Sequence, residues 1–453
     1  MGKLTRRVVL GAGTAALAGA AYGVHTLRKR PGPAPLGFKL TQEERARGVA
    51  FLKAHPAIDA HAHPGQTFVR GASGLPPLLQ VYSAKGGFER RTVGDMVDGG
   101  LAASSFAAVA DFNVLDLSKE KGLIERRPFE QGEAWESYKI QIANLKKLAS
   151  NGLVTAMSAP GEIDAVRSTA KPGAIWTVEG ADFLTGSTDR LQEAYDDGVR
   201  SITLMHYRAN EISEPMTAAG HDSALSPAGE AIVREMNRLG MLIDLAHMPE
   251  SATRRVLDIT DKPVMFSHTH INSDELHHPR FVSADIARHV AATGGLIGAW
   301  PSGIGISDLA GYADRIFQLI DAVGINHVCM GTDMDGNYKP VFDDYRRLPD
   351  LAGLLLKRGL GDKEAAQFFG GNLLRVWQQS VNPKSPFYDE ALLLRGIGVR
   401  FKGDEKTNVE EYCISEGWIR VSAGKAVDRK GNPLTMLLKG PVEVWIKDDQ
   451  AEG

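Results

Sequence analysis

The chain has 453 residues, of which 43% are hydrophobic and 24% are charged, so it is long enough for one large domain and a smaller one. This composition excludes a disordered or low-complexity protein. The 52 Lys and Arg residues and 55 Asp and Glu residues leave a net charge of -3 without a long basic run, which argues against nucleic-acid binding and favours a small-molecule partner.

Residues 1–35 are typical of an export signal followed by a linker. Thr5-Arg6-Arg7 precedes a mildly apolar stretch rich in Gly and Ala, and small residues at 18–21 offer a cleavage site. The segment resembles a twin-arginine signal, so we expect a periplasmic protein. An uncleaved N-terminal membrane anchor is the alternative, because the basic residues 28–30 would flank the apolar stretch on its far side.

Folded protein is expected to begin near Thr41, where Thr41-Gln-Glu-Glu44 has the form of a capping box. From there, short β-rich runs alternate with amphipathic helical runs. This alternation predicts an α/β fold, a (β/α)8 TIM-type barrel over residues 36–380, with a doubly wound open sheet as the alternative. The expected strands are Ala57–Ala60, Ala107–Ala110, Ala174–Val178, Ser201–Met205, Met241–Asp244, Val264–Ser267, Leu296–Ala299 and His327–Gly331. The expected helices include Trp135–Ser150, Ser226–Leu239 and Pro249–Ile259.

The pattern changes in the last part of the chain, residues 381–453. Polar and apolar residues alternate in Gly398–Phe401, Trp418–Ala423 and Val442–Ile446, with turn signals at 402–404 and 430–433. We therefore expect a small β-rich domain. Its Cys413 has no histidine in the module and is better explained as a small core residue than as a nucleophile.

Residues that commonly bind metals follow several of the expected barrel strands. His61 and His63 are separated by one residue in an extended segment, so their side chains point the same way. Taken singly, each such residue is more often a hydrogen-bonded buried group. In a barrel, however, all carboxyl ends of the strands meet on one face. The joint pattern predicts two divalent metal ions, best matched by Zn2+, at His61, His63, Glu179, His247 and His268.

Three further assignments follow from the chemistry of such a centre. Glu179 is the carboxylate assigned to bridge the metals, and the water between them would become a hydroxide nucleophile. Asp333 is then free to take the proton of that hydroxide and pass it to a leaving amine, and it is favoured over Asp335, which lies further into the loop. His206 is placed to polarise the scissile carbonyl.

Over residues 41–380 the chain resembles the renal or membrane dipeptidases, which are zinc peptidases with an amidohydrolase-like barrel. The matching motifs are Ile-Asp-Ala-His61-Ala-His63, Val-Glu179-Gly, Leu-Thr-Leu-Met-His206, the run from Glu235 to His247, Pro-Val-Met-Phe-Ser-His268, Gly-Thr-Asp333-Met-Asp-Gly and Gly-Asn-Leu-Leu-Arg375-Val. The resemblance implies that His61 and His63 bind one metal and His247 and His268 the other. It also implies that Arg280 holds the terminal carboxylate of a dipeptide substrate.

Two positions depart from the family pattern. The family more often has an aspartate at the position of His63, so the first metal site gains positive charge. Arg280 lies in His277-His278-Pro279-Arg280-Phe281, where the family usually has Arg-Asn. His270, His277 and His278 are left as solvent-facing or supporting residues.

We therefore expect a metallo-dipeptidase that cleaves dipeptides with a free C-terminal carboxylate. Two alternatives stay open: the same barrel acting on an N-acyl amino acid, a β-lactam or a lactone, and a periplasmic binding or scaffold protein without catalysis. A homodimer is left open beside a monomer. From residue 381 onward the chain resembles a small uncharacterised bacterial family, which implies no function.

Overall fold

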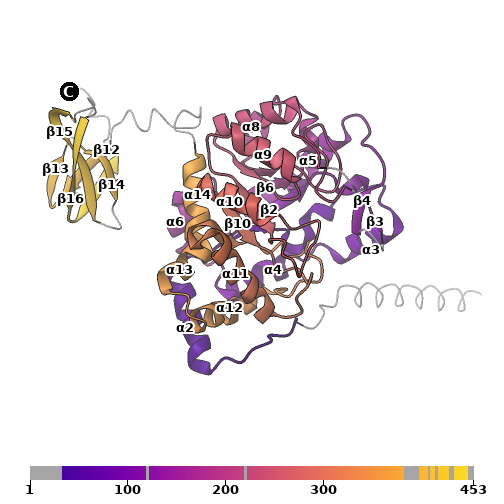
Figure 1. The fold of residues 1–453 in the computed structure, drawn as a ribbon, viewed down its shortest axis with the longest axis horizontal. Helices are drawn as coiled ribbons and strands as arrows, with labels where there is room; N and C mark the ends of the chain where they lie inside the picture. Colours follow the sequence, from indigo (N-terminus) through magenta and orange to yellow (C-terminus); the bar gives the residue numbers. More distant parts are fainter. Residues whose placement is uncertain are drawn as a thin grey trace, which may run out of the picture. The chain divides into compact units, whose positions relative to one another are not determined.

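The computed structural model describes residues 33–118, 122–218, 222–381, 397–406, 409–413, 417–427 and 433–446. The chain divides into two compact units, Met1–Asn382 and Pro383–Gly453, which are described separately (Figure 1). The expected export signal lies outside the described residues. Within the described ranges, no helix has the length and apolar character needed to cross a membrane.

The first unit is built on a parallel sheet whose strands follow one another in sequence order. The order is β1-β2-β6-β7-β8-β9-β10-β11, and β5 pairs with β6 beside this path. The strands are β1 (Ile58–Ala62), β2 (Ala103–Val109), β5 (Thr155–Ala156), β6 (Gly173–Glu179), β7 (Val199–Thr203), β8 (Leu242–Asp244), β9 (Met265–Thr269), β10 (Leu296–Ala299) and β11 (Val328–Met330). Most of their residues are buried, as in a parallel sheet covered by helices on the outside.

The first and last strands of this sheet meet and close it into a barrel. Where β1 ends, the His63 N–H donates to the Met334 carbonyl at 2.8 Å and the Asp333 N–H donates to the His61 carbonyl at 2.8 Å. These two bonds make a short parallel bridge between Ala62 and Met334. The expected (β/α)8 barrel is thus confirmed, and the open-sheet alternative is wrong because β1 and β11 are neighbours.

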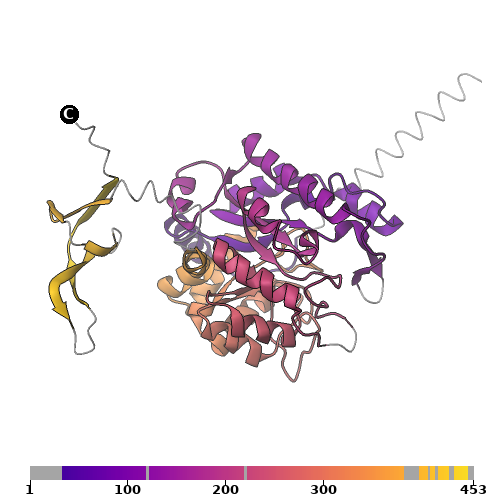
Figure 2. The same cartoon turned by 90° about the horizontal axis from the view of Figure 1, so that it is seen from above.

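Helices surround the sheet, and Figure 2 shows those of the first half of the unit opposite those of the second half. They are α2 (Gln42–Ala54), α3 (Pro77–Lys85), α4 (Glu89–Gly99), α5 (Glu133–Ser150), α6 (Ile163–Arg167), α7 (Leu191–Asp196), α8 (Pro227–Leu239), α9 (Glu250–Ile259), α10 (Ala284–Ala292), α11 (Leu309–Val323), α12 (Leu348–Lys357), α13 (Asp362–Ala366) and α14 (Asn372–Ser380). In Figure 1, α2 lies beside α12, although the two are far apart in sequence.

Local sequence explains where these helices begin. The expected capping box is present: the Glu44 N–H donates to the Thr41 hydroxyl at 3.1 Å, and the Thr41 N–H donates to the Glu44 carboxylate at 2.8 Å. Ser226 caps α8 by accepting from the Gly229 N–H at 3.0 Å. The inner face of α8 then buries Ile232, Val233, Met236 and Leu239 against the barrel.

The barrel strands approach so closely that certain positions must lack a side chain. A Cβ atom on Gly298 would lie 1.8 Å from the Ser267 carbonyl oxygen, and one on Gly331 would lie 1.7 Å from the same atom. Glycine is therefore required within β10 and directly after β11, where the backbone approaches Ser267 of β9. This tight packing fixes the strand ends that carry the site.

In the second unit, the described residues form two small antiparallel sheets. Its strands are β12 (Ile397–Phe401), β13 (Asp404–Lys406), β14 (Val409–Cys413), β15 (Trp418–Val427), β16 (Pro433–Lys439) and β17 (Val442–Ile446). The sheet orders are β13-β12-β17 and β14-β15-β16. Val399, Phe401, Ile419, Val421 and Val442 form its own apolar core. The expected β-rich module is confirmed; the Cys413 side chain and most of the expected turn at 430–433 lie outside the described residues.

The sequence-based boundaries differ from the structure in instructive ways. All eight expected barrel strands are present, but β2 begins at Ala103, earlier than expected, because Ser104 and Ser105 are buried despite being polar. The hairpin of β3 (Leu115–Ser118) and β4 (Gly122–Glu125) was not expected. His327 lies in a short 3-10 turn before β11 rather than in the strand.

Candidate functional site

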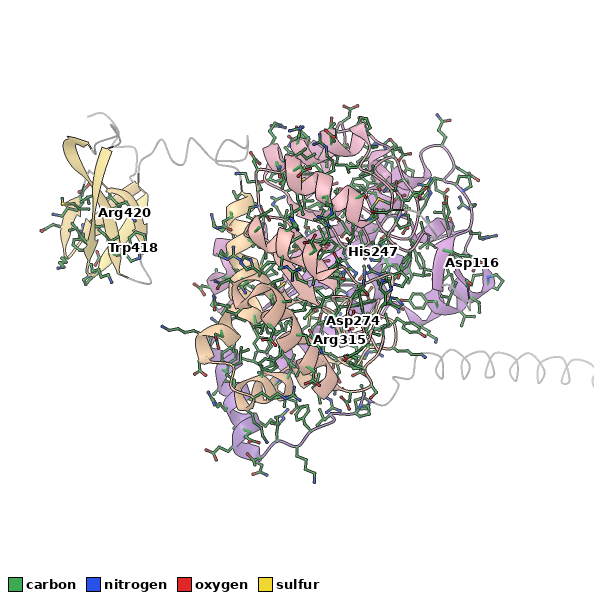
Figure 3. The ribbon with its side chains drawn as sticks, in the orientation of Figure 1. Asp116, His247, Asp274, Arg315, Trp418 and Arg420 are labelled. Carbon is green, nitrogen blue, oxygen red and sulfur yellow. The ribbon has the colours of Figure 1, made fainter. Side chains whose placement is uncertain are left out.

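The predicted site residues come from the carboxyl ends of six barrel strands. His61 and His268 lie within β1 and β9, and Glu179 is the last residue of β6. His63, His206, His247 and Asp333 lie just beyond strand ends, whereas Arg280 lies further along the segment between β9 and α10. All of them are buried, and the structure brings all of them together at one face of the barrel, which Figure 3 locates through the labelled His247. They are His61, His63, Glu179, His206, His247, His268, Arg280 and Asp333.

Glu179 lies between two sets of imidazoles. Its Oε1 is 3.0 Å from His247 Nε2, 3.5 Å from His268 Nε2 and 3.4 Å from His61 Nε2. Its Oε2 is 3.2 Å from His63 Nε2 and 3.3 Å from His206 Nε2. One carboxylate therefore presents its two oxygens to different histidines.

The histidines also face one another in pairs. His61 Nε2 and His63 Nε2 are 3.1 Å apart, and Asp333 Oδ1 lies 3.4 Å from His63 Nε2. On the other side of Glu179, the Nε2 atoms of His247 and His268 are 3.2 Å apart. Three overlapping groups of ligand atoms, each within 4.8 Å, result: His61 with Glu179 and His268, His61 with His63 and Asp333, and Glu179 with His206 and His247.

The hydrogen bonds of the imidazole nitrogens indicate whether these side chains can bind a metal ion. His63 Nδ1 faces the Ala107 carbonyl at 3.2 Å, so in the neutral ring this nitrogen carries the hydrogen and Nε2 directs a lone pair inward. Arg280 Nη2 donates to His247 Nε2 at 3.0 Å, which marks that nitrogen as a lone pair as well. Imidazole lone pairs converging on a carboxylate are the ligands that zinc and similar ions prefer. The residues present fit such a group.

His206 is oriented by Asp111, a residue that the sequence analysis missed. His206 Nδ1 lies 2.6 Å from Asp111 Oδ1, and the other Asp111 oxygen accepts the Tyr207 N–H at 3.2 Å. Asp111 follows β2 and is fully buried, so it is a carboxylate at a strand end like Glu179. Its position after the apolar run 106–110 was the signal that could have found it.

The charges of the centre are strongly coupled. Burial favours the neutral form of Glu179, but His206 and His61 outweigh it and hold the pKa of this carboxylate well below its usual range. Burial also opposes protonation of His63, yet Asp333 and Glu179 raise its pKa to about 10. In contrast, burial and then Arg280 lower the pKa of His247 well below that of a free imidazole. A metal at His63 would therefore displace a proton.

Two of the site residues have a left-handed backbone. His247 has φ 68° and Asp333 has φ 54°, a region that non-glycine residues adopt only when their surroundings impose it. For Asp333 the constraint includes its bond to the His61 carbonyl. Gly336 lets the loop approach closely, because a Cβ there would lie 2.5 Å from both Asp333 Oδ1 and His63 Cδ2.

Two buried aspartates within the strands support the histidines, and the sequence analysis did not single them out. Asp59 accepts hydrogen bonds from the Thr332 N–H at 2.9 Å and the Tyr345 hydroxyl at 2.7 Å. Asp244 accepts from the Ser267 N–H at 2.9 Å and the Thr203 hydroxyl at 2.7 Å. Each aspartate lies two or three residues before a site histidine, in an otherwise apolar strand, which is the signal that could have identified them.

The structure also places the less favoured residues. Asp335 accepts from the Gly65 N–H at 2.6 Å and the Thr92 hydroxyl at 2.8 Å, so it fastens a loop. His277 is exposed and His278 is half-buried, whereas His270 is buried and bonded to Gln318 at 3.0 Å.

Comparison with known proteins identifies the family to which this chain belongs. Residues 51–386 match the membrane dipeptidase family, peptidase family M19. The chain belongs to the membrane dipeptidase family. Residues 378–446 match a second family, described as a protein of unknown function (DUF3297).

Two curated relatives of this membrane dipeptidase family member are themselves named dipeptidases. An uncharacterised dipeptidase of Schizosaccharomyces pombe is 34% identical over 211 residues, which cover 44% of this chain and 51% of that protein. The dipeptidase aclJ of Aspergillus oryzae is 36% identical over 210 residues, which cover 44% of this chain and 49% of that protein. The chain thus spans about half the length of the curated relatives it matches.

Solved structures share the barrel. A metallopeptidase from Rhodobacter sphaeroides, in complex with a phosphinate mimic of the dipeptide L-Ala-D-Ala, has a TM-score of 0.60 at 20% identity, covering 72% of this chain and 99% of that one. The probable dipeptidase PvdM from Pseudomonas aeruginosa has a TM-score of 0.61 at 17% identity, covering 75% and 99%. These likenesses establish the fold.

Proposed function

We propose that this protein is a dipeptidase with two divalent metal ions, best matched by Zn2+, and that it hydrolyses dipeptides with a free C-terminal carboxylate. The observation that carries the proposal is the position of Glu179, whose Oε1 lies within 3.5 Å of His247, His268 and His61 and whose Oε2 lies 3.2 Å from His63. His61 and His63 would hold one ion and His247 and His268 the other, with Glu179 between them. The family and the named dipeptidase relatives support this assignment.

The metals would supply a Lewis acid and a water whose pKa falls towards neutrality. Asp333 Oδ1 lies close to the His63 side of the centre, so its carboxylate can accept the proton of the attacking water and deliver it to the leaving amine. His206, held by Asp111, can donate from Nε2 towards the scissile carbonyl oxygen as negative charge develops there. Burial disfavours the protonated form of His206, but Asp111 and Glu179 outweigh it and raise its pKa, which keeps that donor available.

Arg280 is the residue we assign to the substrate carboxylate. Its guanidinium is buried, lies 5.0 Å from the centroid of the Trp300 ring, and has an Nε without a hydrogen-bond partner in the described chain. A planar guanidinium with one unpartnered N–H donor suits a carboxylate. The Rhodobacter sphaeroides metallopeptidase, which shares this fold, binds a phosphinate mimic of a dipeptide, and this supports the assignment.

His63 distinguishes the first metal site from the usual family pattern. A neutral imidazole in place of a carboxylate leaves that site with more positive charge, while Asp333 at 3.4 Å from His63 partly restores the balance. We therefore propose that Zn2+ remains suitable, because zinc binds imidazole nitrogen readily.

A substrate panel tests the function. The full-length chain, purified with zinc supplied, is assayed with dipeptides, their C-terminal amides, N-acyl amino acids, a β-lactam and a lactone. We expect dipeptide hydrolysis, with kcat/KM lower by at least about tenfold for the amides because Arg280 loses its partner. Turnover of only the non-peptide substrates would favour the alternative hydrolase, and bound metal without any turnover would favour a scaffold.

A further inference from the structure

Arg315 of α11 is a buried cation outside the catalytic centre, and Figure 3 labels it within the barrel unit. Its side chain is 2% exposed. Nη1 donates to the carbonyls of Trp300 at 3.1 Å and Ser302 at 2.7 Å, and Nη2 donates to the Ile304 carbonyl. In the described part of the chain no carboxylate forms an ion pair with Arg315, and Nε has no hydrogen-bond partner.

A buried charge without a counter-ion is energetically costly. Burial lowers the pKa of Arg315 to about 10, so the guanidinium still carries its charge at neutral pH. Its neighbour His270 supplies no counter-charge, because an imidazole is never an anion; burial and then Arg315 lower its pKa to about 3, so it is neutral. The compensation for this charge comes from three main-chain carbonyls, the Ser302 hydroxyl at 3.4 Å and one aromatic ring.

Those contacts join two segments that follow neighbouring strands. The carbonyls belong to residues 300–304, directly after β10. The ring is that of Phe281, which follows β9 and whose centroid lies 5.3 Å from the Arg315 guanidinium carbon. The planar Arg315 guanidinium thereby connects the segment after β10 with the segment after β9.

The same two segments hold Arg280. Phe281 is its immediate neighbour in sequence, and Trp300 lies against the Arg280 guanidinium at 5.0 Å. The Trp300 ring also packs against His268, with centroids 5.9 Å apart. Among the described residues, Arg315 forms no hydrogen bond with Arg280 or with the histidine centre, so it acts on them through these two segments.

We propose that Arg315 is a positioning residue that sets the affinity of the site for the substrate carboxylate by fixing Arg280 between Trp300 and His247. The proposal rests on the proposed function and deepens it, because it names a determinant of specificity for a free C-terminus. Without the Arg315 guanidinium, the segment 300–304 loses four hydrogen bonds and Arg280 gains conformational freedom. The metal ligands and Asp333 keep their own supports, so the chemical step is preserved.

The experiment compares Arg315→Met and Arg315→Lys with the parent, using one dipeptide and its C-terminal amide. Arg315→Met should raise KM for the dipeptide by about tenfold or more, while kcat changes by less than about threefold, because ground-state positioning is lost. KM for the amide should hardly change. Arg315→Lys should give a KM for the dipeptide between those of the parent and Arg315→Met, since lysine keeps the charge without the planar guanidinium. Metal content should equal that of the parent.

Arg375→Met is the matched control. Arg375 also donates to main-chain carbonyls, at Gly294 and Asn326, but it lies in α14, away from the segments that hold Arg280. Its loss should lower stability and leave the preference for the dipeptide over the amide unchanged. If Arg315→Met does not fold, Phe281→Leu is tested in its place. It should reduce the preference for the dipeptide over the amide, because it removes the aromatic ring that contacts the Arg315 guanidinium.

Two failures are distinguishable. If the parent itself does not prefer the dipeptide over the amide, the proposed function is wrong in assigning Arg280 to the substrate carboxylate. If the parent has the preference and the folded Arg315 and Phe281 variants retain it in full, the positioning role is wrong. An equal loss of kcat for both substrates would also overturn it, because that result indicates a general structural effect.

Discussion

Asp333 is the side chain on which the proposed chemistry depends most. Asp333→Asn keeps the size of the residue and its capacity for hydrogen bonds but removes the base. We expect kcat to fall by at least about 10²-fold, with little change in KM and with both metals retained. Steady-state kinetics together with elemental analysis check this expectation.

Asp258→Asn, on the exposed surface of α9, serves as the control and should leave kcat unaffected. Near-parent activity of Asp333→Asn would refute the acid/base role. Loss of metal together with activity would indicate that Asp333 is a metal ligand instead. Its position close to His61 and His63 makes this the main alternative.

At the residue scale, sequence patterns predicted the histidines better than the carboxylates that orient them. His61, His63, His247 and His268 follow apolar runs, and strand alternation with barrel geometry brings them together. Asp111 was missed because it precedes a short turn and its partner, His206, is 95 residues away. A hydrogen bond of that kind depends on the relative placement of two strand ends, which local sequence does not encode.

At the scale of elements, Asp59 joins the first and last barrel strands. It accepts from the backbone N–H and hydroxyl of Thr332 and from the Tyr345 hydroxyl. Asp59→Ala would leave these buried donors without a partner, so we expect the free energy of unfolding to fall by about 2–4 kcal/mol. Urea unfolding of the purified chain measures this change.

Asp116→Ala is the control for that measurement. Asp116 lies in the β3–β4 hairpin, labelled in Figure 3, and accepts a local bond from the Leu117 N–H. Its removal should change stability by less than about 0.5 kcal/mol. Equal effects of the two substitutions would mean that Asp59 does not stabilise the barrel closure.

The strands themselves were predictable because a parallel sheet buries both faces and leaves short apolar runs in the sequence. The β3–β4 hairpin was not, since Leu115–Ser118 and Gly122–Glu125 are short, partly exposed and mixed in polarity. The early start of β2 was missed for the opposite reason. Ser104 and Ser105 are polar but buried, and only neighbouring strands reveal that environment.

At the scale of the whole molecule, two units with separate apolar cores lie in one chain. Every residue proposed for catalysis belongs to the first unit. The second unit matches a family of unknown function, and the proposed reaction uses none of its residues. Export through residues 1–35, periplasmic location and a homodimer stay predictions.

The most direct test of the central claim is a metal titration of the full-length chain. Metal is removed with a chelator, zinc is added back in measured equivalents, and dipeptide hydrolysis is followed at each step. The proposal predicts that activity rises until about two equivalents are bound, and that Glu179→Ala binds fewer, because the bridge between the two sites is lost. Full activity at one equivalent, or activity in the metal-free chain, would contradict the binuclear account.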